Sequence, residues 1–522
     1  MQKLNRRNFI RLVSGMGGAF AISSCAPRGM MGPMMQSDAS QDQLLLTPVT
    51  VESQPSIKTN VVGSNFVPDL EITLRAIVDD FTFASDVSTP ILRYVGELVE
   101  GTSNNLTEVP NSFLGPTIRV RRGQKVRVNL INELATKTII HWHGQHLPED
   151  MDGHPLYAVD SGETYTYEFE VTNRAGTYWY HPHPDKQTGA QVYFGLAGLF
   201  IIEDEAEEEF NLPTGEFDLP LVIHDRTFQS NGELQYVDNG HQIMVGFWAN
   251  SVLINGQLNY TQNVSSRPYR LRLLNGSNAR LYKVAWDDGS PIKIIGTDGG
   301  LLAAPVEREY ITLAAAERLD LWVDFKGIQN GETKSLIALP FEGGNQSMVE
   351  LIRFEVTQQV ESDLILPTAF SPLNFPDPKT AINYDSPRQF DFFLDHMTPV
   401  VDGKRFEIND ADPNETVKLN TLEIWEVTND VNGANGFPHP IHIHGVQFQV
   451  IERSILPQAK RMWDTIKNGY VDEGWKDTVL LMPGERAKLC LKFEDHTGLF
   501  LFHCHNLEHE DGGMMRNYRV EI

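Results

Sequence analysis

A thiol, several imidazoles and a thioether lie close together near the carboxyl end of the chain. Cys504 stands between His503 and His505, and His509 and Met514 follow shortly after. An apolar run before them predicts a buried strand, whose alternation sends His503 and His505 to one face and Cys504 to the other. A thiolate, two imidazoles and a weak axial thioether form a blue copper site. Cys504, His509 and Met514 supply three of these four ligands.

His439 is the candidate for the missing imidazole. It opens the run His439-Pro440-Ile441-His442-Ile443-His444. On a strand, His442 and His444 share one face, which leaves His439 free to turn toward the copper held by Cys504. Segment 439–444 can therefore serve two metal centres, as segment 503–505, here called the Cys504 segment, can.

Histidine pairs with one residue between them occur at four places, and each pair puts both imidazoles on one face of a strand. Eight imidazoles suit a cluster of three copper ions. Ordinary strand histidines explain any single pair, but four pairs beside a matching cysteine and methionine favour metal binding. The pairs are His141 and His143, His181 and His183, His442 and His444, and His503 and His505. The remaining histidines are interpreted as ordinary polar residues: His146, His154, His224, His241, His396 and His496.

These four blocks resemble the copper-binding blocks of multicopper oxidases, the family of laccases and cuprous oxidases. All four occur in the family's order with every ligand present. The resemblance implies four copper ions (one type 1, one type 2, two type 3), O2 as a partner, and a small reducing substrate. By this resemblance, type 1 copper is held by His439, Cys504, His509 and Met514, type 2 by His141 and His442, one type 3 by His143, His181 and His505, and the other by His183, His444 and His503.

Two carboxylates match acidic positions that resemble the family's proton-delivery groups. Asp152 follows the first histidine block, and Glu510 is next to His509. Reduction of O2 consumes protons, which a positioned carboxyl group can deliver. The alternative is that each carboxylate orients a ligand histidine.

The reducing substrate is expected to be that of a laccase: a phenol, an aromatic amine or a low-valent metal ion. The closing segment 509–515 looks most like copper-efflux oxidases, which oxidise cuprous ion. However, region 350–438 contains one methionine, Met397, and Asn435 and Phe437 stand where ligands for a substrate copper would be expected. A cuprous oxidase or a copper-sequestering protein is the alternative. A non-catalytic scaffold is disfavoured because every ligand is present, and a copper nitrite reductase because it lacks the doubled histidine blocks.

Strands must position these ligands. The chain has 522 residues with 41 Gly and 29 Pro, and its short alternating runs indicate an all-β chain of several domains. The family resemblance implies three cupredoxin-like β-sandwich domains, with the copper cluster between the first and the third and the second as a spacer. The expected strands include 70–76, two short strands around a glycine turn within 116–130, 195–202, a strand in 269–277, 319–325 and 422–429. The expected layout is a signal at 1–25, a disordered tether at 26–65, domains at 66–205, 206–357 and 391–522, and a linker at 358–390.

The amino terminus resembles a twin-arginine export signal, with Arg6 and Arg7 before a short uncharged stretch that is no membrane anchor. This predicts the export machinery as a partner and a periplasmic or cell-envelope location. The segment ending at Cys25 is similar to a lipoprotein cleavage box, so lipidation of Cys25 and ordinary cleavage nearby both stay open. The methionines between 30 and 35 are interpreted as part of the tether, with cuprous binding as the alternative.

The net charge of −26 argues against nucleic acid and anionic membrane surfaces as partners, although an acidic surface by itself indicates solubility. Lipid on Cys25 is therefore the one membrane contact considered. The third cysteine, Cys490, is expected to be a small buried apolar residue, and no disulfide framework follows.

Overall fold

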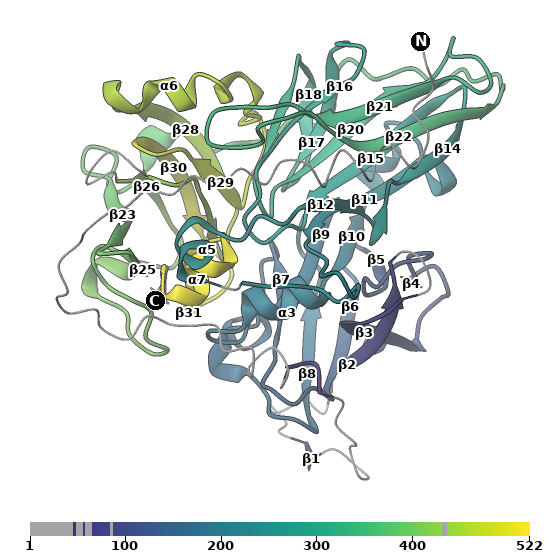
Figure 1. The fold of residues 1–522 in the computed structure, drawn as a ribbon. Coiled ribbons are helices and arrows are strands. Elements are labelled where there is room, and N and C mark those ends of the chain that lie inside the picture. Colours follow the sequence, from purple (N-terminus) through teal and green to yellow (C-terminus); the bar gives the residue numbers. More distant parts are fainter. Residues whose placement is uncertain (1–44, 48–55, 58–64, 84–86, 238, 431–435) are drawn as a thin grey trace, which may run out of the picture. The chain divides into compact units, whose positions relative to one another are not determined.

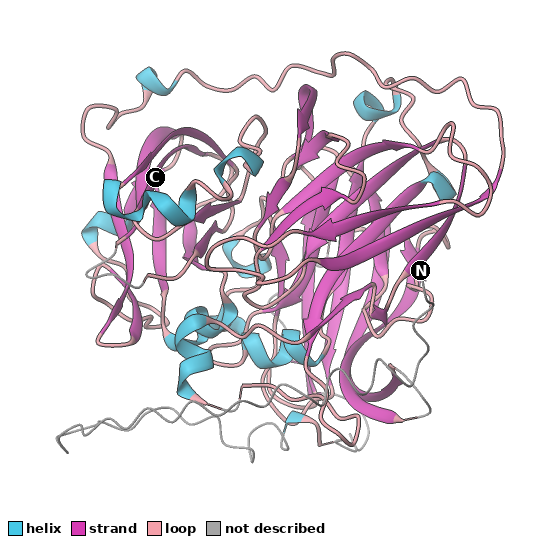
Figure 2. Cartoon of the chain, turned by 45° about the horizontal axis from the view of Figure 1, so that its top comes forward, coloured by secondary structure: helices cyan, strands magenta, loops and turns pink. Residues whose placement is uncertain are grey.

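A computed structural model describes residues 45–47, 56–57, 65–83, 87–237, 239–430 and 436–522. All of these belong to one compact unit, Ser37–Ile522. The export signal, Cys25, the methionines between 30 and 35, and Asn435 lie outside the described residues. Strands dominate the described part (Figure 2), where no helix has both the length and the apolar character to span a membrane.

Two five-stranded sheets between residues 56 and 203 carry the first two histidine pairs. Their strand orders are β1-β8-β6-β2-β3 and β4-β5-β10-β9-β7. The bounds are β1 (Ser56–Ile57), β2 (Leu70–Thr82), β3 (Ser88–Glu100), β4 (Leu106–Thr107), β5 (Thr117–Arg121), β6 (Lys125–Asn132), β7 (Ile140–His143), β8 (Glu163–Glu170), β9 (Gly176–Pro182) and β10 (Gly198–Glu203).

The middle of the chain forms a seven-stranded sheet, β13-β12-β11-β15-β20-β17-β18, and a five-stranded sheet, β14-β22-β21-β16-β19. Their bounds are β11 (Asp218–Arg226), β12 (Ser251–Ile254), β13 (Gln257–Leu258), β14 (Thr261–Ser265), β15 (Pro268–Asn275), β16 (Tyr282–Trp286), β17 (Ile292–Thr297), β18 (Gly300–Arg308), β19 (Ile311–Leu313), β20 (Arg318–Asp324), β21 (Thr333–Ala338) and β22 (Val349–Gln358).

The last two sheets have the orders β24-β23-β26-β30-β28 and β25-β32-β31-β27-β29. The second of them holds the Cys504 segment. Their bounds are β23 (Arg388–Asp395), β24 (Thr398–Val401), β25 (Thr416–Lys418), β26 (Thr421–Asn429), β27 (His439–Ile443), β28 (Phe448–Ile455), β29 (Thr478–Leu481), β30 (Glu485–Phe493), β31 (Gly498–Cys504) and β32 (Met515–Glu521).

The three pairs of sheets share one strand pattern. In each, a first strand pairs in parallel with a second, and the second pairs antiparallel with a third: β2-β6-β8, β11-β15-β20 and β23-β26-β30. A separate hydrophobic cluster lies mainly within each pair. The expected all-β class with three β-sandwiches is thus confirmed.

The expected strand at 195–202 begins later than its apolar run suggests. Helix α3 (Thr188–Phe194) ends at Gly195, whose φ of 135° suits glycine, and β10 starts only at Gly198. The apolar run therefore spans a helix end, a turn and a strand, because hydrophobicity alone does not distinguish them.

Three short helices gather around the end of the Cys504 segment (Figure 1): α3, α5 (Gly240–Val245) and α7 (Leu507–Gly512). The half-buried carboxylate of Asp511 in α7 accepts hydrogen bonds from the backbone N–H groups of Thr188 and Gly189, at 3.0 and 2.8 Å. These contacts fix α7, which carries His509, against the first sandwich.

Candidate metal centres

The histidine cluster, which comprises the eight histidines of the four pairs, lies between the first and the third sandwich. In the first sandwich β7 pairs with β9, so that His141 faces His181. In the third sandwich β27 pairs with β31, so that His442 faces His503. All eight side chains are buried. The fold therefore brings together residues that the sequence separates by more than 300 positions, as in the contact of His141 with His442.

The ring nitrogens of the histidine cluster fall into groups of three whose ligand atoms lie within 4.8 Å of one another. Two of these groups match the expected type 3 sets. A further group contains the expected type 2 pair together with His143. The groups are His143, His181 and His505; His183, His444 and His503; and His141, His143 and His442.

Oxygen acceptors fix the tautomers of several cluster histidines. The Nδ1–H of His141 donates to the Asp152 carbonyl at 2.7 Å, and that of His442 donates to the Asp477 carbonyl at 2.7 Å. Each ring thus keeps a lone pair on Nε2, and these two Nε2 atoms lie 3.2 Å apart. Among the described residues, the buried Nδ1 of His143 and both nitrogens of His505 have no hydrogen-bond partner. Converging lone pairs of this kind fit a bound cation.

Burial keeps these imidazoles neutral. It lowers the pKa of His181 and His505 well below the ordinary value, and neighbouring histidines lower it further. Burial also lowers the pKa of His442 to about 3. A neutral imidazole is the form that binds a metal ion, so the electrostatics of the cluster suit metal binding near neutral pH.

The Cys504 site comprises His439, Cys504, His509 and Met514. The Nδ1 atoms of His439 and His509 lie 3.3 and 3.7 Å from Cys504 Sγ. Met514 is fully buried, and its carbonyl accepts a hydrogen bond from Cys504 N at 3.0 Å. Burial raises the pKa of the Cys504 thiol, so binding of a metal ion must release this proton.

His509 also connects the Cys504 site to α5. Its Nε2–H donates to the Met244 carbonyl at 2.8 Å, which leaves the Nδ1 lone pair facing Cys504. Helix α5 contains no buried residue, so a surface helix contacts this imidazole. The sequence did not suggest this contact, because α5 belongs to the middle sandwich.

Asp152 contacts two cluster histidines. In addition to the backbone bond from His141, its Oδ2 lies 2.7 Å from His444 Nδ1. Burial raises the pKa of Asp152 well above its ordinary value. The side chain is 1% exposed, so it is enclosed beside the cluster, in position to orient His444.

Glu510 contacts two other cluster histidines. Its Oε2 lies 3.1 Å from His503 Nδ1, and its Oε1 lies 3.5 Å from His183 Nε2. His503 and His183 belong to the same group of three, so one carboxylate contacts two members of one candidate site.

The cluster also borders a charged group that sequence reasoning missed. Asp477 Oδ1 lies 3.1 Å from His143 Nε2, and the guanidinium of Arg318 binds both Asp477 oxygens at 2.7 and 2.5 Å. Arg318 and Asp477 are fully buried. Arg318 belongs to β20 of the middle sandwich, so this sandwich does more than space the other two.

Further ions extend this buried network. Asp298 accepts the Arg318 backbone N–H at 2.8 Å, and Lys476 Nζ lies 3.2 Å from Asp298 and 3.0 Å from Glu317. Nothing next to Arg318 in the sequence marks it as buried beside histidines. One feature of the sequence could have indicated the buried ion network: the charged pair Lys476-Asp477 stands directly before the apolar strand β29.

The donor set fits copper in both places. Thiolate and imidazole donors with a nearby thioether suit the Cys504 site, and imidazoles alone suit the histidine cluster. In both sites the imidazole nitrogens and, in the Cys504 site, the thiol sulfur are buried and within reach of one another, and Met514 is buried.

Comparisons with known proteins agree with this chemistry. Family models described as multicopper oxidase match residues 95–207 and 372–522. A multicopper oxidase of Staphylococcus epidermidis is 34% identical over 424 residues, 81% of this chain and 86% of that protein. A laccase of Bacillus stratosphericus is 31% identical over 459 residues, 78% of this chain and 88% of that protein.

A solved structure supports the cupredoxin-like fold. The McoA multicopper oxidase of Aquifex aeolicus is 33% identical, with a TM-score of 0.76 over 91% of this chain and 100% of that chain. Similarity in sequence and in structure thus extends over most of both chains. The chain therefore belongs to the multicopper oxidase family and is a copper-dependent oxidase that passes electrons from a reducing substrate to O2.

Proposed function

We propose that this oxidase works with four copper ions, one at the Cys504 site and three in the histidine cluster. The observation that carries the proposal is the position of Cys504. Its Sγ lies beside His439 and His509, while its two neighbours, His503 and His505, belong to different groups of cluster histidines.

The proposed ligand assignment follows these groups. His141 and His442 would hold the type 2 copper, because their Nε2 lone pairs face each other. The Cys504 site would hold the type 1 copper through His439, Cys504, His509 and Met514. The type 3 ions would be held by His143, His181 and His505 and by His183, His444 and His503.

Copper bound in these sites would supply one-electron oxidation of the reductant and four-electron reduction of O2 to water. The chain keeps the two sites in fixed relation, because single peptide bonds join Cys504 to His503 and to His505. Burial of both sites excludes water from the reacting groups.

Asp152 and Glu510 are proposed to deliver protons to the cluster. Asp152 is suited to hold a proton because burial raises its pKa. Glu510 lies against His503 and His183. Orientation of the histidines by the same carboxylates is compatible with this role.

The reductant is proposed to be a phenol, an aromatic amine or a low-valent metal ion, oxidised next to His509. The protein is further proposed to be exported by the twin-arginine route to the periplasm or cell envelope, with Cys25 as the residue to test for lipid. The proposed domains are 66–205, 206–357 and 391–522, joined across 358–390 by a linker.

The test is oxygen uptake by the copper-loaded protein with 2,6-dimethoxyphenol or cuprous ion, with copper content and electron paramagnetic resonance measured on the same sample. We expect turnover, four copper ions per chain, and separate type 1 and type 2 signals. A fully loaded protein without oxygen uptake on any reductant, or binding more copper than four ions without turnover, would instead indicate copper sequestration.

A further inference from the structure

A surface segment fastens the loop that carries Met514, one of the four residues of the Cys504 site. We call this segment, residues 404–415, the strap. It connects β24 to β25, and most of its residues are exposed. β25 pairs in parallel with β32, the strand that follows Met514. Sequence reasoning identified Met514 but did not connect the strap with it, because the strap has the polar and charged composition of an ordinary surface loop.

The strap bonds directly to the two residues before Met514. The backbone N–H of Phe406 donates to the Gly513 carbonyl at 3.1 Å, and Arg405 Nε donates to the Gly512 carbonyl at 3.2 Å. These carbonyls belong to the end of α7, and the last carbonyl groups of a helix have no partner within the helix. The strap therefore caps α7 and fixes the backbone immediately before Met514.

The same two glycines are closely packed. A Cβ added to Gly512 would lie 2.9 Å from Pro399 Cγ in β24, and one added to Gly513 would lie 3.0 Å from Arg405 Nε. Gly513 also has a φ of 110°, in a region that favours glycine. The end of α7 is therefore held by close contact as well as by hydrogen bonds.

Arg516 anchors the strap to the strand that follows Met514. Its guanidinium binds both oxygens of Glu415, at 2.6 and 2.8 Å, and its two terminal nitrogens each lie 3.2 Å from Asp410 Oδ2. Arg516 is 1% exposed and Glu415 is 3% exposed. A two-pronged bond between a guanidinium and a carboxylate adds geometric specificity. The position of the strap along β32 is therefore fixed.

A second side chain of β32, Asn517, connects the strap to the first sandwich. Its Nδ2 donates to the carbonyls of Glu407 and Asp410 at 2.9 and 2.7 Å, while its Oδ1 lies 2.8 Å from His154 Nε2. Asn517 and His154 are both buried. The strap is thus joined to the rigid parts of two sandwiches, so it can hold a loop in place.

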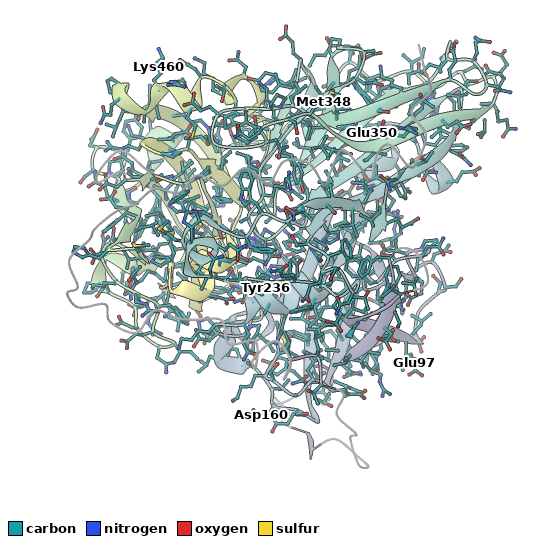
Figure 3. The ribbon with its side chains drawn as sticks, in the orientation of Figure 1. Glu97, Asp160, Tyr236, Met348, Glu350 and Lys460 are labelled. Carbon is teal, nitrogen blue, oxygen red and sulfur yellow. The ribbon has the colours of Figure 1, made fainter. Side chains whose placement is uncertain are left out.

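The start of α7 is held by different residues. Tyr236 (Figure 3) donates its hydroxyl to Glu508 Oε1 at 2.7 Å, and Asn278 Nδ2 lies 2.9 Å from the same oxygen. Glu508 directly precedes His509, whereas the strap contacts directly precede Met514. Movement of the strap should therefore displace Met514 more than His509.

We propose that the strap positions Met514 in the Cys504 site and thereby sets the reduction potential of the copper bound there. This inference rests on the proposed function, which makes the Cys504 site the type 1 site. The axial ligand and the contacts around the ligands tune the potential of a blue copper site. Donation from a sulfur held close stabilises the more positive cupric ion. A loosened strap lets Met514 withdraw, which raises the potential.

Arg405→Met tests one strap bond at the surface of the protein. Arg405 is exposed, so the variant is expected to fold. The matched control is Arg308→Met, because Arg308 in β18 donates from Nε to the Tyr470 carbonyl, also at 3.2 Å. Redox titration of the blue absorption in the full-length copper-loaded enzyme gives the potential of each variant.

Arg516→Met removes the anchor of the strap. Its matched control is Arg127→Met, because Arg127 binds Glu168 through Nε and Nη2, at 2.8 and 2.6 Å. Arg127 belongs to β6, in the sheet of the first sandwich that carries neither histidine pair. Both arginine variants of the strap are also made in a Met514→Leu background, where no thioether is left to position.

We expect Arg516→Met to raise the ratio of reduced to oxidised copper at the Cys504 site at least tenfold at a fixed solution potential, which is a rise of about 59 mV or more. Arg405→Met should shift this ratio in the same direction, by about threefold. Both controls should match the wild type. In the Met514→Leu background, the strap variants should cause no further shift, because coupled residues are not additive.

An unchanged potential in both Arg405→Met and Arg516→Met would overturn the inference, as would equal shifts with and without the Met514 thioether. A wild type without blue absorption would instead overturn the proposed function. Amide hydrogen exchange of residues 504–514 in the copper-free chain would then decide the role of the strap. Faster exchange in Arg516→Met than in Arg127→Met would support it, and equal exchange would exclude it.

Discussion

The histidine cluster and the Cys504 site share adjacent residues on β31, yet the protein holds them differently. The histidine cluster is enclosed by strands of the first and third sandwiches and by the Arg318–Asp477 pair of the middle one. The Cys504 site depends on a short helix, α7, and its His509 contacts Met244, which lines a cavity of about 1040 Å³. The histidine cluster is enclosed by protein, whereas the Cys504 site has a cavity nearby.

This difference matches the two halves of the reaction, reduction of O2 and oxidation of the reductant. Reduction of O2 needs fixed ligands and exclusion of water, which buried ion pairs between sandwiches provide. Oxidation of a reductant needs access from outside, which a pocket beside His509 provides. The residues that tune each task are therefore expected on different elements, and four variants test this separation.

The largest effect is expected for Cys504→Ser, which removes the thiolate shared by His439 and His509. Strong blue absorption should disappear, and oxygen uptake should fall by at least about 100-fold, because even changes outside the ligand set alter activity 10- to 100-fold. Copper in the histidine cluster should remain and retain its type 2 resonance. Cys490→Ser is the control, because Cys490 lies in a separate hydrophobic cluster. Loss of the type 2 signal in Cys504→Ser would contradict the separation.

The next largest effect is expected for Arg318→Met, which leaves Asp477 buried without its partner. Breaking a buried ion pair costs about 3–5 kcal/mol. The first urea-induced unfolding transition should shift accordingly, and the type 2 resonance should change while the blue absorption persists.

Arg388→Met is the matched control for Arg318→Met. Arg388 binds the Glu423 carboxylate in the same two-pronged way, at 2.8 and 2.7 Å, but no cluster histidine contacts this pair. Its side chain is 16% exposed but that of Glu423 is only 2% exposed, so Arg388→Met also leaves a buried carboxylate without its cation, and we expect a comparable loss of stability, about 3–5 kcal/mol, with an unchanged resonance. Equal resonance changes in both variants would show that Arg318 acts only through general stability.

A smaller effect is expected for Gly144→Ala. Gly144 has a φ of 86°, and an added Cβ would lie 2.2 Å from Asp477 Oδ2 and 2.9 Å from Arg318 Nη2. Gly123 has nearly the same φ, 88°, with open space around the added atom. Gly123→Ala should therefore lower the free energy of unfolding only by the cost of a positive φ in a residue other than glycine, about 1–2 kcal/mol. Thermal unfolding should show a larger loss of stability for Gly144→Ala than for Gly123→Ala, with an altered type 2 resonance. Equal losses would mean that the Arg318–Asp477 pair moves to accept the added Cβ without an energetic cost.

The smallest effect is a pH dependence at Asp402, which ends the hairpin that packs against α7. Burial raises the pKa of Asp402 to about 6. A carboxyl group with a raised folded pKa favours folding at low pH, and this stabilisation is lost as pH rises from about 4 to 6. Asp402→Asn should remove this slope and add less than about 1 kcal/mol at pH 7, because the group is partly exposed. Denaturation curves of the wild type and of Asp402→Asn at pH 4.5 and 7 check this prediction. If stability changes between the two pH values by the same amount in both proteins, Asp402 is not the source of the pH dependence.

The sequence by itself determined the donor types and their local faces. Histidine pairs with one residue between them must share a strand face, and Cys504 must point away from His503 and His505. Glycine turns and alternating runs determined the all-β class and most strand positions. The helix end at Gly195 was missed because a short apolar run is compatible with either a helix or a strand.

Only the tertiary structure decided which distant residues meet. His141 meets His442 because two sandwiches pack together, and Arg318 reaches Asp477 because a third sandwich packs beside them. One cavity is likewise lined by Met244, Met397 and Met462, which come from separate segments. Local periodicity fixes the direction of a side chain within its own element, whereas contacts between elements depend on how their buried faces fit together.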